Sequence, residues 1–260
     1  MNSDRYTDIN SATIDRWIAE GWCWGMPISH DVYQKALAGE WGVLLTSSKT
    51  VPQEWFLPFL KGNKLTGTKL LGLASGGGQQ MPVFAALGAD CTILDYSEKQ
   101  LASEKMVAER EGYHINIVRA DMTKPLPFDN ESFDLIFHAI SNCYVEDVYH
   151  IWNECYRVLR KGGVLIAGMD NGINFLFDDH NADPLVVVNK VPFNPLKDPE
   201  LFETYVATDG VQFSHTLEEQ IGGQLKAGFV LTDLYEDREP DCNLGRHFPQ
   251  YIATRAIKMQ

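Results

Sequence analysis

Residues 70–82 read Leu-Leu-Gly-Leu-Ala-Ser-Gly-Gly-Gly-Gln-Gln-Met-Pro. The apolar start predicts a buried strand, and the segment that begins with the two glutamines predicts a helix, so three glycines fill the turn between them. Glycines allow the backbone to approach a ligand closely, and the free N–H groups of a helix N-terminus favour a carboxylate or a phosphate. The stretch therefore predicts a strand, a turn and a helix that bind a nucleotide-like ligand.

Two phosphate-binding motifs share this glycine-rich character, and the spacing disagrees with both. A dinucleotide fingerprint needs a third glycine three residues after its second, and with Gly76 and Gly78 as the first two that place holds Met81. A P-loop needs Gly-Lys-Ser/Thr, and none follows. Tight turns after strands also use glycine for steric reasons, so the turn alone is weak support for a ligand site.

The chain beyond Lys69 alternates short apolar runs with helical patterns, which is typical of β–α units with parallel strands. Ser97 and Gln100 have the spacing of a capping box at a helix start, and Gly112 suits the helix end. The expected strands cover residues 69–74, 91–94, 115–119, 133–138, 164–169, 229–235 and 251–257. The expected helices cover residues 97–112 and 144–160, and a third runs from a capping box at Thr216 to Gly228.

The glycine stretch resembles the motif of class I S-adenosylmethionine-dependent methyltransferases, in which a strand ends in Asp-x-Gly-x-Gly-x-Gly before a helix. Within this class the chain is similar to the type 11-like methyltransferases, in a bacterial subgroup of unassigned substrate. The resemblance implies an α/β fold with a Rossmann-like, doubly wound seven-stranded sheet, mostly parallel with an antiparallel last strand. It extends in order and spacing over residues 65–170, through Asp95-Tyr96-Ser97, Asp121-Met122, residues 126–138 and residues 157–163.

The resemblance also implies a site for S-adenosyl-L-methionine, with S-adenosyl-L-homocysteine as the product. Asp95, nineteen residues after Gly76, stands where the family keeps an acid on the ribose hydroxyls, and a carboxylate accepts two hydrogen bonds from a cis diol at once. Asp121 and Met122 correspond to the pair that contacts adenine through a carboxylate and a backbone N–H. The expected cofactor-binding residues are Ala74, Ser75, Gly76, Gly78, Gln80, Asp95, Tyr96, Asp121, Met122 and His138.

The chain departs from the family motif at two positions. Gly72 replaces the acidic residue that the family often carries early in the motif, and Ala74 replaces its first glycine. Loss of the acid removes a hydrogen-bond acceptor that fixes the loop, so Gln79, Gln80 or a residue of the N-terminal segment is expected to hold the loop or the methionine ammonium instead. Ala74 is small enough to keep the close approach.

Two stretches fall outside the alternating pattern. Residues 1–64 read as a helical, aromatic-rich cap with five of the six tryptophans, and residues 171–214 read as an irregular insertion or lid. Residues 65–170 are then the cofactor-binding core, and residues 215–260 complete the same sheet, so we expect one structural domain. The cap and the insertion are expected to roof a pocket at the carboxyl ends of the strands, unless their aromatic side chains simply cover the core.

The composition of the chain limits the binding partners that we expect. The 260 residues carry 22 Lys and Arg against 35 Asp and Glu, and the net charge of −13 repels phosphate backbones and anionic lipid surfaces. The Asn-Pro-Pro-Tyr type of motif that grips nucleic-acid bases is absent after the fourth strand, where residues 138–141 read His-Ala-Ile-Ser. Nucleic acid and membrane are therefore disfavoured, and the oligomeric state is not predicted. A small neutral or cationic acceptor is expected between the cap and the phenylalanines of the insertion, which are Phe175, Phe177, Phe193, Phe202 and Phe213.

The cysteines and the first residues indicate the compartment. Five scattered cysteines form no Cys-x-x-Cys pair and no zinc-like cluster, so reduced thiols in the cytoplasm are the simplest interpretation. Residues 1–5 are polar and lack the apolar stretch of a secretory signal, and the longest apolar runs are strand-sized. Asp178-Asp179-His180 has no second ligand cluster, so no metal is assigned.

Methyl transfer from a sulfonium is an in-line displacement that needs alignment and exclusion of water, and a base helps only when the acceptor arrives protonated. His138, at the end of the fourth strand, is the candidate base, although contact of its backbone with the cofactor is favoured over catalysis by its ring. His30, His180 and His215 are further candidates, with packing or surface roles as the competing interpretation. Two other functions stay open, a non-catalytic S-adenosylmethionine-binding protein and an NAD-dependent oxidoreductase.

Overall fold

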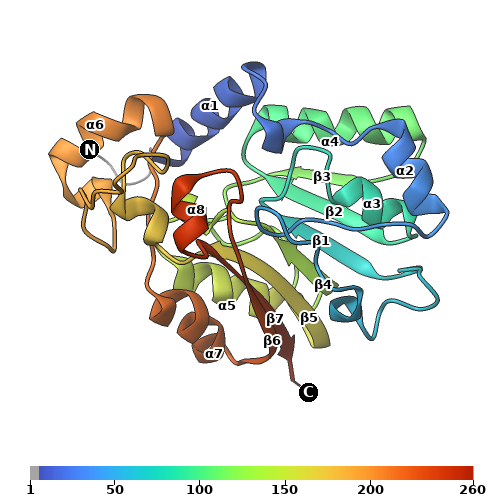
Figure 1. The fold of residues 1–260 in the computed structure, drawn as a ribbon. Helices are drawn as coiled ribbons and strands as arrows, with labels where there is room; N and C mark the ends of the chain where they lie inside the picture. The colour runs from blue at the N-terminus through green and yellow to red at the C-terminus, as the bar shows by residue number, and fades with distance from the viewer. Residues whose placement is uncertain (1–5, 260) are drawn as a thin grey trace.

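A computed structural model describes residues 6–259, so the polar residues 1–5 lie outside the described part of the chain. At its centre is a seven-stranded sheet with the strand order β3-β2-β1-β4-β5-β7-β6 (Figure 1). The first five strands pair in parallel, and β7 runs antiparallel to both β5 and β6. This arrangement confirms the mostly parallel, Rossmann-like sheet expected from the sequence. The strands are β1 (Lys69–Leu73), β2 (Asp90–Asp95), β3 (Asn116–Arg119), β4 (Phe133–His138), β5 (Leu159–Asp170), β6 (Phe229–Asp237) and β7 (Tyr251–Lys258).

Helices cover both faces of the sheet. On one face α3 and α4 contact each other and β2, and on the other α5 contacts β5 and α7 (Figure 1). A π-helical turn, Glu218–Gly222, leads into α7, and short 3-10 turns lie elsewhere in the loops. The helices are α1 (Tyr6–Ala19), α2 (His30–Leu37), α3 (Met81–Ala86), α4 (Glu98–Glu111), α5 (Val148–Val158), α6 (Pro199–Asp209), α7 (Gly223–Ala227) and α8 (Asn243–His247).

The largest differences from the expected boundaries lie around α5. This helix begins at Val148, four residues later than expected, because the Asp147 carboxylate accepts from the N–H groups of the first turn and caps it there. It ends at Val158, because Leu159 already pairs with Phe133 of β4. A register shift between Phe133 and Leu135 allows this early pairing, so β5 starts five residues before the apolar run that predicted it.

Helix caps follow the sequence more closely. The Ser97 hydroxyl accepts from the N–H of Gln100 at the start of α4, and Gly112 ends the helix with a φ of 75°. The capping box at Thr216 is complete, because the Thr216 N–H donates to the Glu219 carboxylate and the Glu219 N–H donates to the Thr216 hydroxyl. Short-range capping signals therefore predicted these two helix starts.

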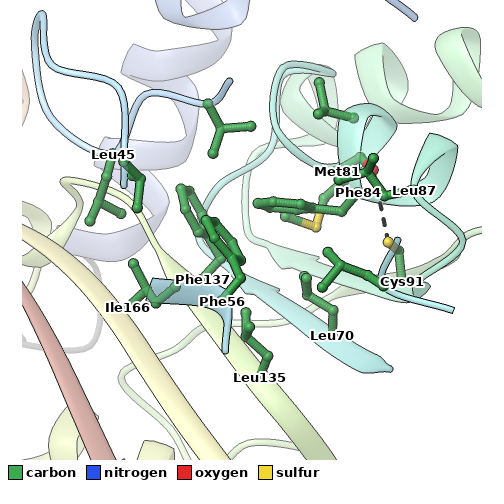
Figure 2. Packing of buried hydrophobic residues seen from close by; sticks show 14 of the residues in the cluster. Leu45, Phe56, Leu70, Met81, Phe84, Leu87, Cys91, Leu135, Phe137 and Ile166 are labelled. Carbon is green, nitrogen blue, oxygen red and sulfur yellow. Dashed lines mark hydrogen bonds between the residues drawn. The ribbon is translucent and has the colours of Figure 1, made fainter. Parts of the chain in front are cut away.

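Two clusters of buried apolar side chains fill the two faces of the sheet. In the first, Leu70 of β1 packs with Phe84 and Phe137, and Figure 2 shows Leu45 and Phe56 of the N-terminal segment beside them. The second cluster lies between the sheet and α5. The N-terminal segment therefore contributes side chains to the main core, and part of its aromatic content is structural.

The insertion of residues 171–214 packs against α1. Phe213 and Val211 form a small buried cluster with Tyr6 of α1. The rings of Tyr6 and Phe213 pack edge to face, with 5.3 Å between their centroids. The Asn10 side chain donates to the Val211 carbonyl and accepts from the Val211 N–H. This third cluster joins α1 to the insertion through apolar contacts and a reciprocal pair of hydrogen bonds.

Polar contacts complete the seating of α1. Arg16 donates to the carbonyl oxygens of Ala207 and Thr208 in the last turn of α6, where the helix dipole favours a cation. On the side of the core, Asp15 accepts from the Ser97 hydroxyl. α1 and α6 lie side by side at the upper left of Figure 1. α1 is thus held from the insertion and from the start of α4 together.

The described residues contain neither a membrane-spanning helix nor a metal-binding cluster. Among residues 6–259, no helix is long and apolar enough to cross a bilayer. In the same range, no group of three or more His, Cys, Asp or Glu side chains is placed to hold a metal ion. The five cysteines are free thiols, and all except Cys23 are buried.

A carboxyl group lies buried beneath the glycine turn. Glu104 of α4 is fully buried, and its Oε1 accepts from the Gly78 N–H at 2.8 Å. Its Oε2 has no hydrogen-bond partner among the described residues. Burial raises the pKa of Glu104 to about 8, so the group holds its proton at neutral pH.

This raised pKa predicts how stability depends on pH. In the unfolded chain Glu104 has its ordinary pKa of 4.5, so its contribution to folding is fully present below that pH and is lost as the pH rises through about 8. We expect the free energy of unfolding of the wild type to fall relative to Glu104→Gln between pH 5 and 9. The loss is about 1.4 kcal/mol for each pH unit between the two pKa values.

Urea denaturation of both proteins at pH 5, 7 and 9 measures this difference. Glu109→Gln is the matched control, because Glu109 lies in the same helix and is exposed, and its variant should keep the pH slope of the wild type. A Glu104→Gln variant with the wild-type slope would show that Glu104 is ionised in the folded protein.

Candidate functional site

A cavity of about 270 Å³ lies at the carboxyl ends of the parallel strands. Its floor comes from the loops that follow β1, β2, β3 and β4. Its roof comes from α1, from Trp22 and Trp24, and from residues 44–47. This is the position at which open α/β sheets bind ligands, because loops from neighbouring strands diverge there.

The glycine turn after β1 is packed tightly against the end of β2. The Gly76 N–H donates to the Asp95 Oδ2 at 3.1 Å, and a Cβ on Gly76 would lie only 2.9 Å from that oxygen. Gly77 has a φ of 104°, and a Cβ there would lie 2.6 Å from the Trp24 carbonyl oxygen. Both positions therefore exclude side chains, and Gly76 itself lines the cavity.

Asp95 sits at the end of β2 with both carboxylate oxygens engaged by backbone. Besides Gly76, the Ser97 N–H donates to its Oδ1 at 3.0 Å. Burial raises the pKa of Asp95 to about 6, although the N–H groups of Ser97 and Gly76 act in the opposite direction. Each carboxylate oxygen can accept a second hydrogen bond, so the group is able to take ribose hydroxyls as well.

Two buried polar atoms on the cavity wall have no partner among the described residues. They are the Ser75 hydroxyl and the Gln100 Oε1. A buried polar atom without a hydrogen bond is costly. S-adenosylmethionine is rich in the hydroxyl, amine and carboxylate groups that can pair with such side chains, so the residues present fit this cofactor.

The position of the missing family acid is closed by packing. A Cβ on Gly72 would lie 2.7 Å from the Met81 Sδ and 2.8 Å from the Ser75 Oγ, so this site admits only glycine without rearrangement. Other groups hold the turn instead: Glu104 accepts from the Gly78 N–H, and Ile28 donates to the Gly78 carbonyl.

The two glutamines after the turn bind the N-terminal segment. Gln79 Nε2 donates to the carbonyl oxygens of Cys23 and Met26 at 2.8 and 3.0 Å. Gln80 Nε2 donates to the Leu44 carbonyl at 3.4 Å. Both side chains therefore tie the roof of the cavity to the glycine turn, which is one of the roles expected for them.

The structure brings most of the predicted cofactor residues together around the cavity. Gly78 does not line it, and a Cβ on this residue would face Pro27 and the Ser103 carbonyl of α4. The residues on the wall are Ala74, Ser75, Gly76, Gln80, Asp95, Tyr96, Asp121 and Met122. His138 is the other predicted residue that does not line it.

His138 is a packing residue and not an accessible base. It is fully buried, with Nδ1 bonded to the Leu73 carbonyl oxygen at 2.9 Å and Nε2 to the Asn142 Oδ1 at 2.8 Å. Its ring packs edge to face on Trp152 of α5, and burial lowers its pKa. Side chains alternate along β4, so the His138 ring points to the α5 face of the sheet and away from the cavity.

The other candidate histidines also lie off the cavity wall. His30 pairs with Glu111 on the surface, and His180 bonds to the Asn174 carbonyl in the insertion. His215 is buried and bonds to the Asn142 carbonyl. No histidine among residues 6–259 lines the cavity.

The sequence predicted that the cap and the phenylalanine-rich insertion both line the pocket. This prediction was wrong for the insertion. No residue of 171–214 lines the cavity. Phe213 packs on Tyr6 of α1, and the rings of Phe175 and Phe193 lie tilted against each other, so these rings pack against α1 and within the insertion. The cap does provide a roof, as expected, through α1 and two of its tryptophans.

Several wall residues were not singled out in the sequence. They come from α1, from residues 44–47, from the loop after β4, and from Glu239 and Tyr251 near the junction of β6 and β7. The loop after β4 was expected only as a family element, and its side chains carry no motif. Glu239 and Tyr251 lie far along the chain from the glycine turn, so no local pattern could have placed them here.

This sheet, its glycine turn and the carboxylate at the end of β2 define an S-adenosylmethionine-dependent methyltransferase. Comparison with known proteins agrees: residues 71–167 match the methyltransferase domain family of type 11. The chain is 40% identical over 258 residues to the uncharacterized methyltransferase YbaJ of Bacillus subtilis, covering 96% of this chain and 97% of the relative. The chain therefore belongs to this methyltransferase family, and the NAD-dependent alternative is set aside.

More distant relatives share the core or the fold. A ubiquinone biosynthesis O-methyltransferase of Sinorhizobium fredii is 30% identical over 107 residues, covering 41% of this chain and 43% of the relative. An S-adenosylmethionine-dependent methyltransferase of Mesorhizobium loti superposes with a TM-score of 0.59 at 20% identity, covering 78% of this chain and 94% of the other. A geranyl diphosphate C-methyltransferase of Streptomyces coelicolor superposes with a TM-score of 0.55 at 14% identity, covering 79% and 78%.

The placement of Asp95 predicts a loss of cofactor affinity in a variant. We expect Asp95→Ala to weaken binding of S-adenosylhomocysteine by at least tenfold, about 1.4 kcal/mol, because a charge-assisted contact with the ribose is removed. Isothermal titration calorimetry measures the change. An unaltered dissociation constant would show that the ribose lies elsewhere.

The same carboxylate predicts a pH dependence. Because the pKa of Asp95 is raised to about 6, the acceptor form is lost as the pH falls through 6, and binding of S-adenosylhomocysteine should weaken between pH 7 and 5. In Asp95→Asn this dependence should disappear. A wild-type affinity that is constant over this range would contradict the assignment.

Proposed function

We propose that this enzyme methylates a small-molecule acceptor that binds inside the cavity. The observation that carries this proposal is the enclosure of the cavity by α1, by the tryptophans Trp22 and Trp24, and by residues 44–47. This roofed space has to hold the cofactor and the acceptor together, so it suits a small acceptor better than a polymer. The biosynthetic name of the Sinorhizobium relative agrees with a small acceptor, although that relative matches only 41% of this chain.

The sheet order separates a cofactor end from an acceptor end. β3, β2 and β1 lie on one side, and they bring Asp121, Asp95 and the glycine turn to the cavity. β4, β5, β7 and β6 follow on the other side, with Ser141, Tyr144 and Tyr251 on the wall. We assign the first group to the nucleoside and the second to the acceptor.

The residues of the cofactor end would hold S-adenosylmethionine as follows. Asp95 accepts from the ribose hydroxyls, and Asp121 and Met122 contact the adenine. Ala74, Ser75 and the glycine turn line the methionine part. When bound, the cofactor supplies an electrophilic methyl group on a sulfonium.

The residues of the cavity wall orient the acceptor and exclude water during methyl transfer. Trp22, Trp24, Leu45 and Ile140 present apolar surface to the cavity, which excludes water from the line of displacement. Burial raises the pKa of Tyr251 to about 12, so its hydroxyl stays neutral and can orient an acceptor through a hydrogen bond. With His138 buried elsewhere, the carboxylate of Glu239 is the group on the acceptor end that can hold a proton from the acceptor.

Charge and thiol chemistry support the remaining parts of the proposal. The net charge of −13 disfavours nucleic acid and anionic lipid as partners. The five free cysteines fit a reducing compartment, and we place the enzyme in the cytoplasm. We retain residues 65–170 as the cofactor-binding core, with residues 1–64 and 171–214 as additions that shape the site.

A labelling experiment tests the acceptor class. The enzyme is incubated with methyl-labelled S-adenosylmethionine and a cell extract, and the extract is then divided into low-mass, nucleic-acid and protein fractions. We expect enzyme-dependent label in the low-mass fraction, and at least a tenfold lower rate with Asp95→Ala at subsaturating cofactor. Enzyme-dependent label confined to nucleic acid or protein would overturn the proposal.

A further inference from the structure

We propose that the acceptor is an amine and that Glu239 selects it. This inference rests on the proposed function, because it concerns the acceptor end of the same cavity. The charged residues on the cavity wall are Asp95, Asp121 and Glu239. No Lys, Arg or His among residues 6–259 joins them, so every charged side chain on the described wall is acidic.

Glu239 belongs to the acceptor end by topology. β6 runs antiparallel to β7, and β7 runs antiparallel to β5, so β6 ends at the same edge of the sheet as the parallel strands. Glu239 follows the end of β6 at Asp237 and therefore reaches this edge. β1, β4, β5 and β7 separate β6 from β2, which carries Asp95. The nucleoside and Glu239 thus occupy opposite ends of the cavity.

Asp237 anchors the wall around Glu239. Asp237 is buried, and it accepts from the Thr46 hydroxyl at 2.7 Å, the Ser48 N–H at 2.7 Å, the Ser48 hydroxyl at 2.6 Å and the Lys49 N–H at 2.9 Å. These hydrogen bonds lower the pKa of Asp237 to about 2 against the effect of burial, so it is ionised at all ordinary pH values. Residues 46–49 are therefore clamped to the end of β6.

Two hydrogen bonds hold Glu239 in place, one to its side chain and one from its backbone. The Ser47 hydroxyl, on the clamped segment, donates to the Glu239 Oε2. The Glu239 N–H donates to the Gln250 side chain at 2.9 Å. One hydroxyl uses only part of the acceptor capacity of a carboxylate, so Glu239 can receive an N–H from a ligand without being moved.

The cationic side chains near Glu239 donate hydrogen bonds to backbone carbonyl groups. Arg238 donates to the Gly245 carbonyl, and Lys49 donates to the Glu236 carbonyl. Neither lines the cavity. A carboxylate or phosphate on an acceptor would meet Glu239 with like charge and no compensating cation, whereas an amine would meet an oriented acceptor. The wall therefore favours a cationic or N–H-bearing acceptor over an anionic one.

The transfer to such an acceptor is balanced without a further reagent. The nitrogen lone pair forms the new N–C bond as the S–C bond breaks, and the sulfur leaves as the neutral thioether of S-adenosylhomocysteine. An ammonium must first lose one proton, for which Glu239 is the acceptor on this side of the cavity.

Sinefungin provides a direct probe of Glu239. It is an analogue of S-adenosylmethionine that carries an amine at the position of the transferred methyl group, so its ammonium points to the acceptor end. We expect the wild type to bind sinefungin at least fivefold more tightly than S-adenosylhomocysteine. Glu239→Gln should remove this advantage and leave the dissociation constant of S-adenosylhomocysteine within twofold, because glutamine can still accept from Ser47.

Calorimetry with both ligands separates the outcomes. Glu236→Gln is the matched control, since Glu236 is exposed on β6 and should keep the wild-type ratio. An equal loss of both ligands in Glu239→Gln would mean that Glu239 binds the methionine ammonium, and an unchanged ratio would mean that it does not sense the acceptor end. Either result overturns the proposal, while failure of S-adenosylhomocysteine to bind the wild type would contradict the cofactor site itself.

The labelled product gives an independent readout. After separation from residual S-adenosylmethionine, the low-mass product is passed over ion-exchange resins at pH 5. We expect retention on the cation exchanger, as for a methylated amine. A product retained on the anion exchanger, or a neutral product, would overturn the amine assignment while leaving the small-molecule proposal intact.

Discussion

The hydrogen bond from the Gly76 N–H to the Asp95 carboxylate fixes the glycine turn to the end of β2. It is possible because Gly76 has no Cβ to strike that oxygen. The other carboxylate oxygen accepts from the Ser97 N–H at the start of α4, and α4 in turn presents Glu104 to Gly78. One carboxylate therefore sets the relative positions of β1, β2 and α4. The cavity opens where these elements meet.

The parts of the molecule that depend on sequence neighbours were predictable. The glycine turn, the cap at Ser97 and the acid at the end of β2 each follow from short-range patterns, and the structure places them together. The start of β5 was not predictable, because Leu159 becomes a strand residue only through its pairing with Phe133 across a register shift. Tertiary pairing overrode the local helical pattern at that point.

Side-chain direction and long-range contacts account for the remaining differences. Strand alternation sends Phe137 into one core and His138 into the other, so proximity of His138 to the strand end did not bring its ring to the cavity. Residues 44–47 and Glu239 reach the wall because a buried Asp237, remote in sequence, binds Thr46 and its neighbours. No motif marks such a contact, since each partner is an ordinary polar residue until the fold joins them.

The seating of α1 separates the residues that touch the acceptor from the residues that determine its space. α1 forms part of the roof, but its apolar support comes from Val211 and Phe213 of the insertion, which itself stays outside the cavity. The insertion therefore supports α1, and with it the roof of the cavity, from outside the cavity. Related enzymes could diverge in substrate by changing residues 171–214 while every cavity-lining side chain stays the same, so comparing only the lining residues would miss part of what determines specificity.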